Sequence, residues 1–124
     1  MDKVVPIKTK EAVFYRQYVE LLNPLIKLRP KELDLLAELL YHNNKLKDID
    51  IKNRWKLILD YDNKKDMATN LDMSVASLGN NLSYLRKKGI IINNQVSNNF
   101  LVYPDKNFKL TFNFIIDDGQ REDI

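Results

Sequence analysis

The stretch NLDMSVASLGNNLSYLRKKGII, residues 70–91, decides what kind of fold the chain adopts. An apolar segment breaks at Asp72, and a second segment starts at Ser74 and ends in two lysines followed by Gly89. Aspartate is among the few residue types besides glycine that accept left-handed backbone, serine is a favoured helix N-cap, and glycine is a common residue after a helix. The stretch therefore predicts two helices joined by a tight turn.

The predicted helix from Ser74 to Lys88 has two different faces. Its apolar face carries Val75, Leu78, Leu82 and Leu85 at spacings of three, four and three residues. The opposite face is short and polar, with Ala76, Ser77, Asn80, Ser83, Tyr84 and Lys87, and with Asn81 on its flank. Such a helix is suited to the major groove of DNA, where amide and hydroxyl groups reach base edges. A plain solvated face, on a chain rich in Asn and Lys, is the alternative.

Asparagine can form two hydrogen bonds with adenine, worth roughly 1–3 kcal/mol of discrimination, so Asn80 and Asn81 are the best candidates for reading sequence. Lysines around the helix pair are expected to contact phosphates, which orient a protein on DNA without reading its sequence. The expected base contacts are Ser74, Ala76, Ser77, Asn80, Asn81 and Tyr84, and the expected phosphate contacts are Lys64, Lys65, Lys87 and Lys88.

The first helix of this pair is expected to begin at an N-cap on Asn63, with Asp66 completing a capping box. Its inward residues are expected to be Met67, Ala68 and Leu71, and Met73 is expected to fill the corner before the second helix.

An earlier helix is predicted from about Lys10, and Pro24 is expected to end or kink it near Asn23. It carries two adjacent apolar stripes, Phe14, Tyr18, Leu21 and Leu25, and Tyr15, Val19, Leu22 and Ile26. The width of this face has two interpretations: the helix is wedged into the core, or part of it pairs with a second subunit. Under the second interpretation, the dimer interface comprises Phe14, Tyr15, Tyr18 and Leu22.

Two more helices follow. One starts with Pro30 at its first position, where the missing N–H costs nothing, and turns Leu33, Leu36, Ala37 and Leu40 inward. The other spans about Ile51 to Leu59, and its Trp55 is expected in the core.

The period then changes to two, because apolar residues alternate from Phe108 to Ile116, which predicts a half-buried strand. GIII and FLVY flank the polar stretch NNQVSNN and predict a hairpin, with a turn at Pro104 and Asp105 before the last strand. The expected fold class is mainly α with a small antiparallel β-sheet (α+β).

MATNLDMSVASLGNNLSYLRKKGII, residues 67–91, resembles the helix-turn-helix of winged-helix DNA-binding regulators, in particular the MarR-like group. The upstream LRPKELDLLAELL is similar to the segment that opens the winged-helix core in that group. Asp72 stands where glycine is usual in the group, and Asn81 where an apolar residue is common. The matching positions are Ala68, Leu71, Met73, Ser74, Ser77, Leu78, Leu82, Leu85, Lys88, Gly89 and Ile90.

The resemblance implies a winged helix-turn-helix domain over residues 29–117, preceded by an N-terminal helix in residues 1–28 that acts as a dimerisation element. Residues 118–124 would form an acidic flexible tail. The wing carries no Arg or Lys, and its Asn94, Gln95 and Asn98 are the residues that could make polar contacts with DNA. The chain ends on the predicted strand, whereas many MarR-like dimers are completed by a pair of C-terminal helices.

The composition of the chain narrows the range of functions that we expect. The 124 residues fit one domain, and the absence of cysteine favours a reducing cytoplasm. No segment reads as a membrane span or a secretory signal. A net charge of +3 permits binding to a polyanion. His42 has no second imidazole or thiolate to complete a metal site, and there is no phosphate-binding glycine loop, so neither an enzyme nor a cofactor is expected.

Together these features predict sequence-specific binding of double-stranded DNA by a transcriptional regulator of bacterial or phage type, acting as a homodimer. One alternative is a winged helix used for protein–protein interaction, as a structural or adaptor subunit of an assembly. Another is the DNA-binding part of a replication initiator or packaging subunit. The residues do not specify the operator or a small-molecule effector.

Overall fold

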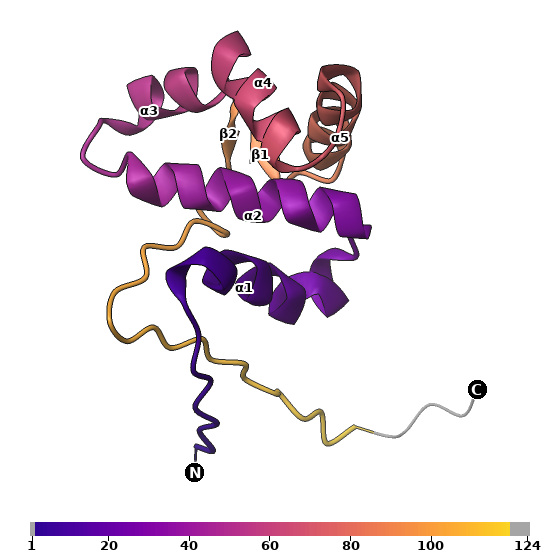
Figure 1. Cartoon of the computed structure of the whole chain (residues 1–124). Coiled ribbons are helices and arrows are strands. Elements are labelled where there is room, and N and C mark those ends of the chain that lie inside the picture. The colour runs from indigo at the N-terminus through magenta and orange to yellow at the C-terminus, as the bar shows by residue number, and fades with distance from the viewer. Residues whose placement is uncertain (1, 120–124) are drawn as a thin grey trace.

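The computed structural model describes residues 2–119 and confirms a mainly helical α+β fold with a small antiparallel sheet (Figure 1). The described residues form five helices and two short strands. Their bounds are α1 Glu11–Ile26, α2 Pro30–Lys45, α3 Ile51–Ile58, α4 Tyr61–Asn70, α5 Val75–Lys87, β1 Ile91–Ile92 and β2 Gln95–Val96.

The second helix, α2, is the centre of the molecule. Figure 1 shows α1 on one side of α2, and α3, α4, α5 and the hairpin on the other. Pro30 occupies the first position of α2, as predicted. The four residues expected to face inward are buried, and Leu35 and Leu39 are buried as well. A helix that packs on opposite sides needs this wider apolar surface, which the expected single stripe understated.

The first helix does not end at Asn23, and the prediction of a break at Pro24 is wrong. The helix includes Pro24 and reaches Ile26, and Lys27 then adopts left-handed backbone with a φ of 54°. The Lys27 N–H donates to the Asn23 carbonyl at 2.7 Å, and the Asn23 side chain accepts from the Leu28 N–H at 2.7 Å. These bonds close the helix end and offset the hydrogen bond that proline cannot make.

The first helix contributes to the same core as the rest of the chain. Tyr15 and Tyr18 are 3% and 7% exposed, and Val19 is fully buried. The Tyr15 hydroxyl accepts from Asn44 at 2.9 Å, and the Tyr18 hydroxyl donates to the Phe100 carbonyl at 3.3 Å. Burial raises the pKa of both tyrosines. Tyr15 and Tyr18 are therefore core residues, and their assignment to a dimer interface is wrong.

The outer side of α1 differs from its core side. Phe14 and Leu22 are half-buried against the core, while Leu21 and Leu25 of the predicted stripe are exposed. The helix α1 thus forms part of the domain body, with some apolar surface left on its solvent side.

The third helix places Trp55 in the core, as predicted, with 2% of its surface exposed. Arg54 beside it is also buried, and its guanidinium donates to the Lys47 and Ile49 carbonyls and to Asn43. It also donates to the Tyr103 hydroxyl at 2.9 Å. A buried charge needs such partners, and these contacts join the loop after α2 to the segment that follows the hairpin.

The fourth helix starts earlier than expected. Its N-cap is Asp60, whose carboxylate accepts from the Asp62 N–H at 3.3 Å, so the predicted cap at Asn63 is wrong. Asn63 instead donates to the Ile58 carbonyl at 2.7 Å and ties α4 to the end of α3. The predicted turn is confirmed at Asp72, whose φ is 53°.

The sheet is smaller than predicted. Ile91 pairs with Val96 and Ile92 with Gln95, and Asn93 and Asn94, with φ values of 55° and 58°, form the turn. Two consecutive residues with positive φ make the tight turn that favours a two-residue hairpin loop. The partner of β1 is therefore Gln95–Val96, and the expectation that the FLVY segment would pair with it is wrong.

The predicted strand at residues 108–116 is also absent from the described chain, where this segment has no regular secondary structure. It leaves the body near α1 and extends into solvent (Figure 1). An alternating segment becomes a strand only where a neighbouring strand offers unpaired N–H and C=O groups. The described part of the expected tail, residues 118 and 119, is exposed, and the rest of it lies outside the described residues. Among residues 2–119, no helix is long and apolar enough to cross a membrane.

Candidate nucleic-acid interface

The fifth helix is fixed to the body by its leucines. Leu78, Leu82 and Leu85 are all at most 1% exposed. Full burial of each leucine stabilises the fold by roughly 1.5–3 kcal/mol. The Ser74 hydroxyl accepts from the Ser77 N–H at 3.0 Å, which confirms the predicted N-cap, and Gly89 follows the helix with a φ of 74°. Val75, expected on the inward face, is instead 38% exposed.

The outward side of α5 is exposed along its whole length. Its residues recur at spacings of three and four: Ala76, Gly79, Asn80, Ser83, Arg86 and Lys87. The middle of this surface is made of small residues, and a Cβ added at Gly79 would meet no atom within 4 Å. We call these six residues the outer face of α5. Small central side chains let another surface approach the helix backbone closely, and the basic residues lie together at the C-terminal end.

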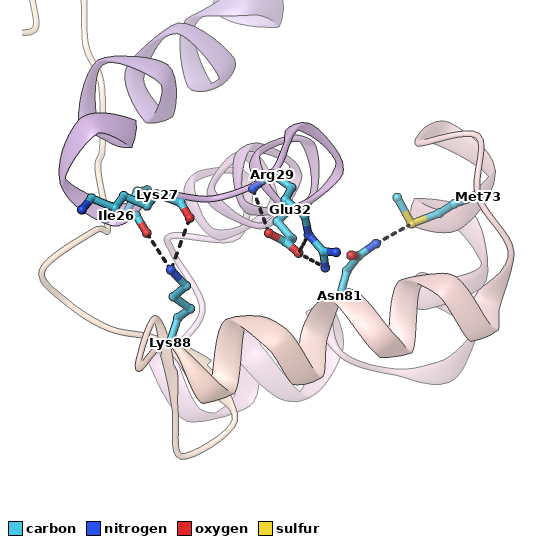
Figure 2. A network of polar contacts seen from close by, with 7 residues as sticks. All are labelled: Ile26, Lys27, Arg29, Glu32, Met73, Asn81 and Lys88. Atoms are coloured by element: carbon cyan, nitrogen blue, oxygen red, sulfur yellow. Dashed lines mark hydrogen bonds and ion pairs between the residues drawn. The ribbon is translucent and has the colours of Figure 1, made fainter.

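Asn81 does not belong to this outer face. It is 8% exposed, and its side-chain amide lies 3.6 Å from the Met73 sulfur (Figure 2). Asn81 thus lies in the corner between α4 and α5, at a buried position. The expectation that Asn81 reads bases is therefore wrong, and Asn80 is the asparagine that faces solvent.

Tyr84 is also turned toward the body and is half-buried. The Arg29 guanidinium lies 4.9 Å from the centre of its ring, and the Lys88 ammonium 5.6 Å. Such cation–π contacts contribute roughly 0.5–1 kcal/mol each at exposed sites. The ring thus packs against the start of α2 and lies beside the outer face of α5, and the expectation that Tyr84 contacts bases stays a prediction.

Arg29 is itself paired with a buried carboxylate. Glu32 is fully buried at the start of α2, and it forms an ion pair with Arg29 and accepts from the Arg29 backbone N–H at 2.8 Å (Figure 2). This hydrogen-bonded pair raises the pKa of Arg29. The contact anchors the α1–α2 link beside α5.

Lys88 reaches in the same direction. Its ammonium donates to the carbonyls of Ile26 at 3.4 Å and Lys27 at 3.3 Å, at the C-terminal end of α1 (Figure 2). A cation at this position is favoured because helix carbonyls there lack partners. Lys88 is exposed, and its expected contact with phosphate stays a prediction beside this structural contact. Arg86, which the sequence reasoning passed over, is exposed and lies on the outer face.

The remaining predicted DNA contacts are less concentrated. Lys65 is exposed, with its ammonium 5.6 Å from the Tyr61 ring, while Lys64 and Ser77 are half-buried. Ser74 is exposed, but its hydroxyl is engaged in the helix cap. Three exposed carboxylates, those of Asp62, Asp66 and Asp72, lie on α4 and the turn, so the positive charge is concentrated at the far end of α5.

The predicted wing residues lie on and around the hairpin. Asn94 is exposed at its tip and Gln95 is half-buried in β2. Asn98 is exposed in the turn that follows. The hairpin tip thus offers neutral amides, which can hydrogen-bond but do not neutralise phosphate charge.

The titratable groups of the body serve structural roles. His42 lies 3.1 Å from the Glu38 carboxylate, and this hydrogen bond holds the pKa of Glu38 below its usual value. Across residues 2–119, no group of three or more His, Asp or Glu side chains is arranged to hold a metal ion.

No protein-family model, curated protein or solved structure matches this chain. The function proposed below therefore rests on the outer face of α5.

Proposed function

We propose that the chain binds double-stranded DNA through the outer face of α5 and acts as a sequence-specific transcriptional regulator of bacterial or phage type. The observation that supports this is the contrast between the two sides of α5. Leu78, Leu82 and Leu85 fix the helix to the body, while the outer face is solvent-exposed from end to end.

The dimensions of α5 suit the proposed role. Its 13 residues give a length of about 20 Å at a rise of 1.5 Å per residue. A major groove about 12 Å wide admits a helix of ordinary diameter. The side chains of Ala76 and Ser83 are small and Gly79 has none, so the helix backbone can come close to the DNA and Asn80 can reach a base edge. Asn80 then supplies the preference for adenine.

We expect basic residues at both ends of the helix pair to contact phosphates, most strongly at the C-terminal end of α5, where the exposed positive charge is concentrated. Arg86 and Lys87 lie at the C-terminal end of α5, and Lys64 and Lys65 lie in the first half of α4. In this arrangement the backbone contacts set the register of α5 in the groove, and they do not themselves select sequence.

The test is a titration of random duplex DNA by fluorescence anisotropy at several salt concentrations. Neutralising about four phosphates gives a slope near −4 in a plot of log affinity against log salt, or on the order of a hundredfold weaker binding between 50 and 200 mM salt. A selection from random duplexes then identifies the preferred site. Absence of binding at micromolar protein and low salt contradicts the proposal.

A protein-interaction module is the second candidate, and two observations favour it. The hairpin tip carries no charge, and α4 with its following turn exposes Asp62, Asp66 and Asp72. These features weaken the attraction to DNA on one side of the helix pair. The low-salt titration separates the two candidates, because an interaction module of this kind has no salt-dependent affinity for duplex DNA.

A replication initiator or packaging subunit would bind DNA too, and the location of the selected site in the genome distinguishes it from a regulator.

A further inference from the structure

The segment from Asn107 to Gly119, which we call the C-terminal arm, carries large apolar side chains into solvent. Phe114, Ile115 and Ile116 are each more than 80% exposed, and Phe112 is 47% exposed. A soluble surface rarely leaves so many neighbouring large apolar groups uncovered without a binding partner. The alternation of apolar and polar residues over this arm is that of a strand.

The arm is anchored at its beginning. The Phe108 ring packs edge-on against Phe14, with 5.3 Å between ring centres, and against Tyr18 at 5.8 Å. Leu110 is half-buried against the core. The arm then leaves the body (Figure 1). The side of the arm that carries Phe108 and Leu110 is thus already applied to the body at α1, while residues 111–119 are all exposed.

We propose that two copies of this chain associate by pairing their C-terminal arms as antiparallel strands centred on Asn113. Pairing with a copy of itself supplies the strand edge that a single chain lacks. In this register Phe112 lies opposite Phe114 of the second copy, and Leu110 lies opposite Ile116. These four side chains share one face of each strand, because their positions differ by two.

The charges select this register. Centring on Asn113 places Lys109 opposite Asp117 of the second copy, once at each end of the paired segment. Centring on Phe112 would leave Lys109 opposite Ile115, and centring on Phe114 would place Leu110 opposite Asp118. Opposite charges and apolar pairs stabilise an antiparallel ladder when they lie directly across from each other. Of these three registers, only the one centred on Asn113 places opposite charges across from each other and also keeps the apolar residues Leu110, Phe112, Phe114 and Ile116 paired with one another.

The size of the contact is compatible with a specific dimer. A phenylalanine buries roughly 150–250 Å² when fully covered, and Phe112 and Phe114 are 47% and 87% exposed, so these side chains from two copies can bury on the order of 400–670 Å². Ile116 and the strand backbones add to this, toward the 1,200–2,000 Å² of ordinary specific interfaces. Two strands alone are marginal in water, and α1 provides the second layer on which the pair can pack. The association does not depend on whether α5 binds DNA.

The first experiment measures the mass of the full chain in solution by sedimentation velocity over a range of concentrations. We expect a dimer for the wild-type chain and a monomer for Phe114→Asp, because the Phe114 side chain is 87% exposed in the single chain and its loss there costs little packing. Leu57→Asp on α3, a partly exposed leucine away from the arm, is the matched control and is expected to stay dimeric. A wild-type monomer at all concentrations overturns the proposal. So does a dimer that survives Phe114→Asp and is lost in Leu25→Asp, because α1 would then be the interface.

The second experiment tests the pairing itself. Lys109→Asp and Asp117→Lys each place like charges opposite each other at both ends of the pair, and each is expected to weaken dimerisation roughly tenfold. The double variant restores opposite charges and is expected to recover wild-type affinity. Positions 109 and 117 of one extended arm are too far apart to touch, so recovery reports contact between copies. Failure to recover overturns the antiparallel register.

The third experiment uses the absence of cysteine from the chain. Asn113→Cys places a thiol opposite its own copy, at the strand spacing that permits a disulfide, so oxidation is expected to give a covalent dimer. Thr111→Cys is the control, because it lies opposite Ile115 and its thiols are four residues out of register. Equal cross-linking of both variants, or of neither, contradicts pairing centred on Asn113.

Discussion

The amide of Asn81 donates to the sulfur of Met73 at 3.6 Å, and this contact turns the second asparagine of α5 toward the corner between α4 and α5. Its neighbour Asn80 points into solvent. Two adjacent residues of the same type thus have different roles, because each step along a helix turns the side chain by about 100°, and this step carries position 81 past the edge of the exposed face. One asparagine holds the helix pair together, and the other is free to bind.

Substitutions of the two asparagines are expected to have different effects on stability and on DNA sequence preference. Asn81→Ala empties a buried site and is expected to lower the free energy of unfolding by about 1–2 kcal/mol, measured by urea denaturation. Asn80→Ala is exposed and is expected to change stability by less than about 0.5 kcal/mol, but to relax the sequence preference found by selection from random DNA. A loss of sequence preference in a folded Asn81 variant, with Asn80→Ala unchanged, would reverse the two roles.

Gly79 offers a test in which stability and binding change in opposite directions. Gly79→Ala is expected to raise the free energy of unfolding by about 1 kcal/mol, because alanine is the better helix former and its Cβ meets open space. The added methyl group lies in the centre of the outer face of α5. Affinity for duplex DNA is therefore expected to fall roughly tenfold, equivalent to about 1.4 kcal/mol. A stabilised variant with unchanged affinity would show that DNA does not approach this part of the helix.

Lys87 and Lys88 form a natural pair of variant and control. Lys88 donates to two carbonyls at the end of α1, so Lys88→Ala is expected to lower the free energy of unfolding by about 0.5–1 kcal/mol. Lys87 lies on the outer face, so Lys87→Ala is expected to leave stability unchanged, to weaken binding to all duplexes alike, and to reduce the salt slope by about 1. Equal salt slopes for the wild-type chain and Lys87→Ala would exclude a phosphate contact at this residue.

The pair between Glu38 and His42 predicts a pH dependence of stability. The pKa of Glu38 is lower in the folded protein than its ordinary value of 4.5, so the folded state favours the ionised carboxylate. This contribution is fully present above about pH 4.5 and is lost as the pH falls through the folded-state pKa. Glu38→Gln is expected to be less stable than the wild-type chain by about 1 kcal/mol near pH 6.

The same comparison has a clear internal control. The difference in melting temperature between the wild-type chain and Glu38→Gln is expected to shrink toward zero as the pH is lowered from 5 to 3. A difference that stays constant over this range would mean that the carboxylate charge of Glu38 does not stabilise α2.

The sequence was most informative where local rules decide the structure. Ser74, Asp72 and Gly89 delimit α5 as predicted, because caps and left-handed positions depend on residues close in the chain. Pro30 at the start of α2 follows for the same reason. These signals predicted where α2 and α5 begin and where α5 ends.

Features that depend on distant partners were not predictable. The alternation from Phe108 to Ile116 predicts a strand, but this segment pairs with no other strand in the described part of the chain. The tip Asn93–Asn94 closes a tighter hairpin than the one expected, because both residues accept positive φ. Tyr15 and Tyr18 resemble interface residues in the sequence, yet α2 and the segment at Phe100 cover them. Helical spacing places Asn81, Tyr84 and Lys88 near the edge of the exposed face of α5. Only their contacts with the rest of the molecule show that they turn toward the body.

The central claim is that the outer face of α5 enters DNA, and Ser83 lies in the middle of that face. The most direct measurement is the affinity for duplex DNA at low salt of Ser83→Glu beside Lys52→Gln, a variant on α3 with the same change in net charge. Figure 1 shows α3 and α5 near opposite ends of α2. We predict that Ser83→Glu loses at least about tenfold in affinity, and that Lys52→Gln changes it little. Equal affinities for these two variants, with both folded, would contradict binding through α5.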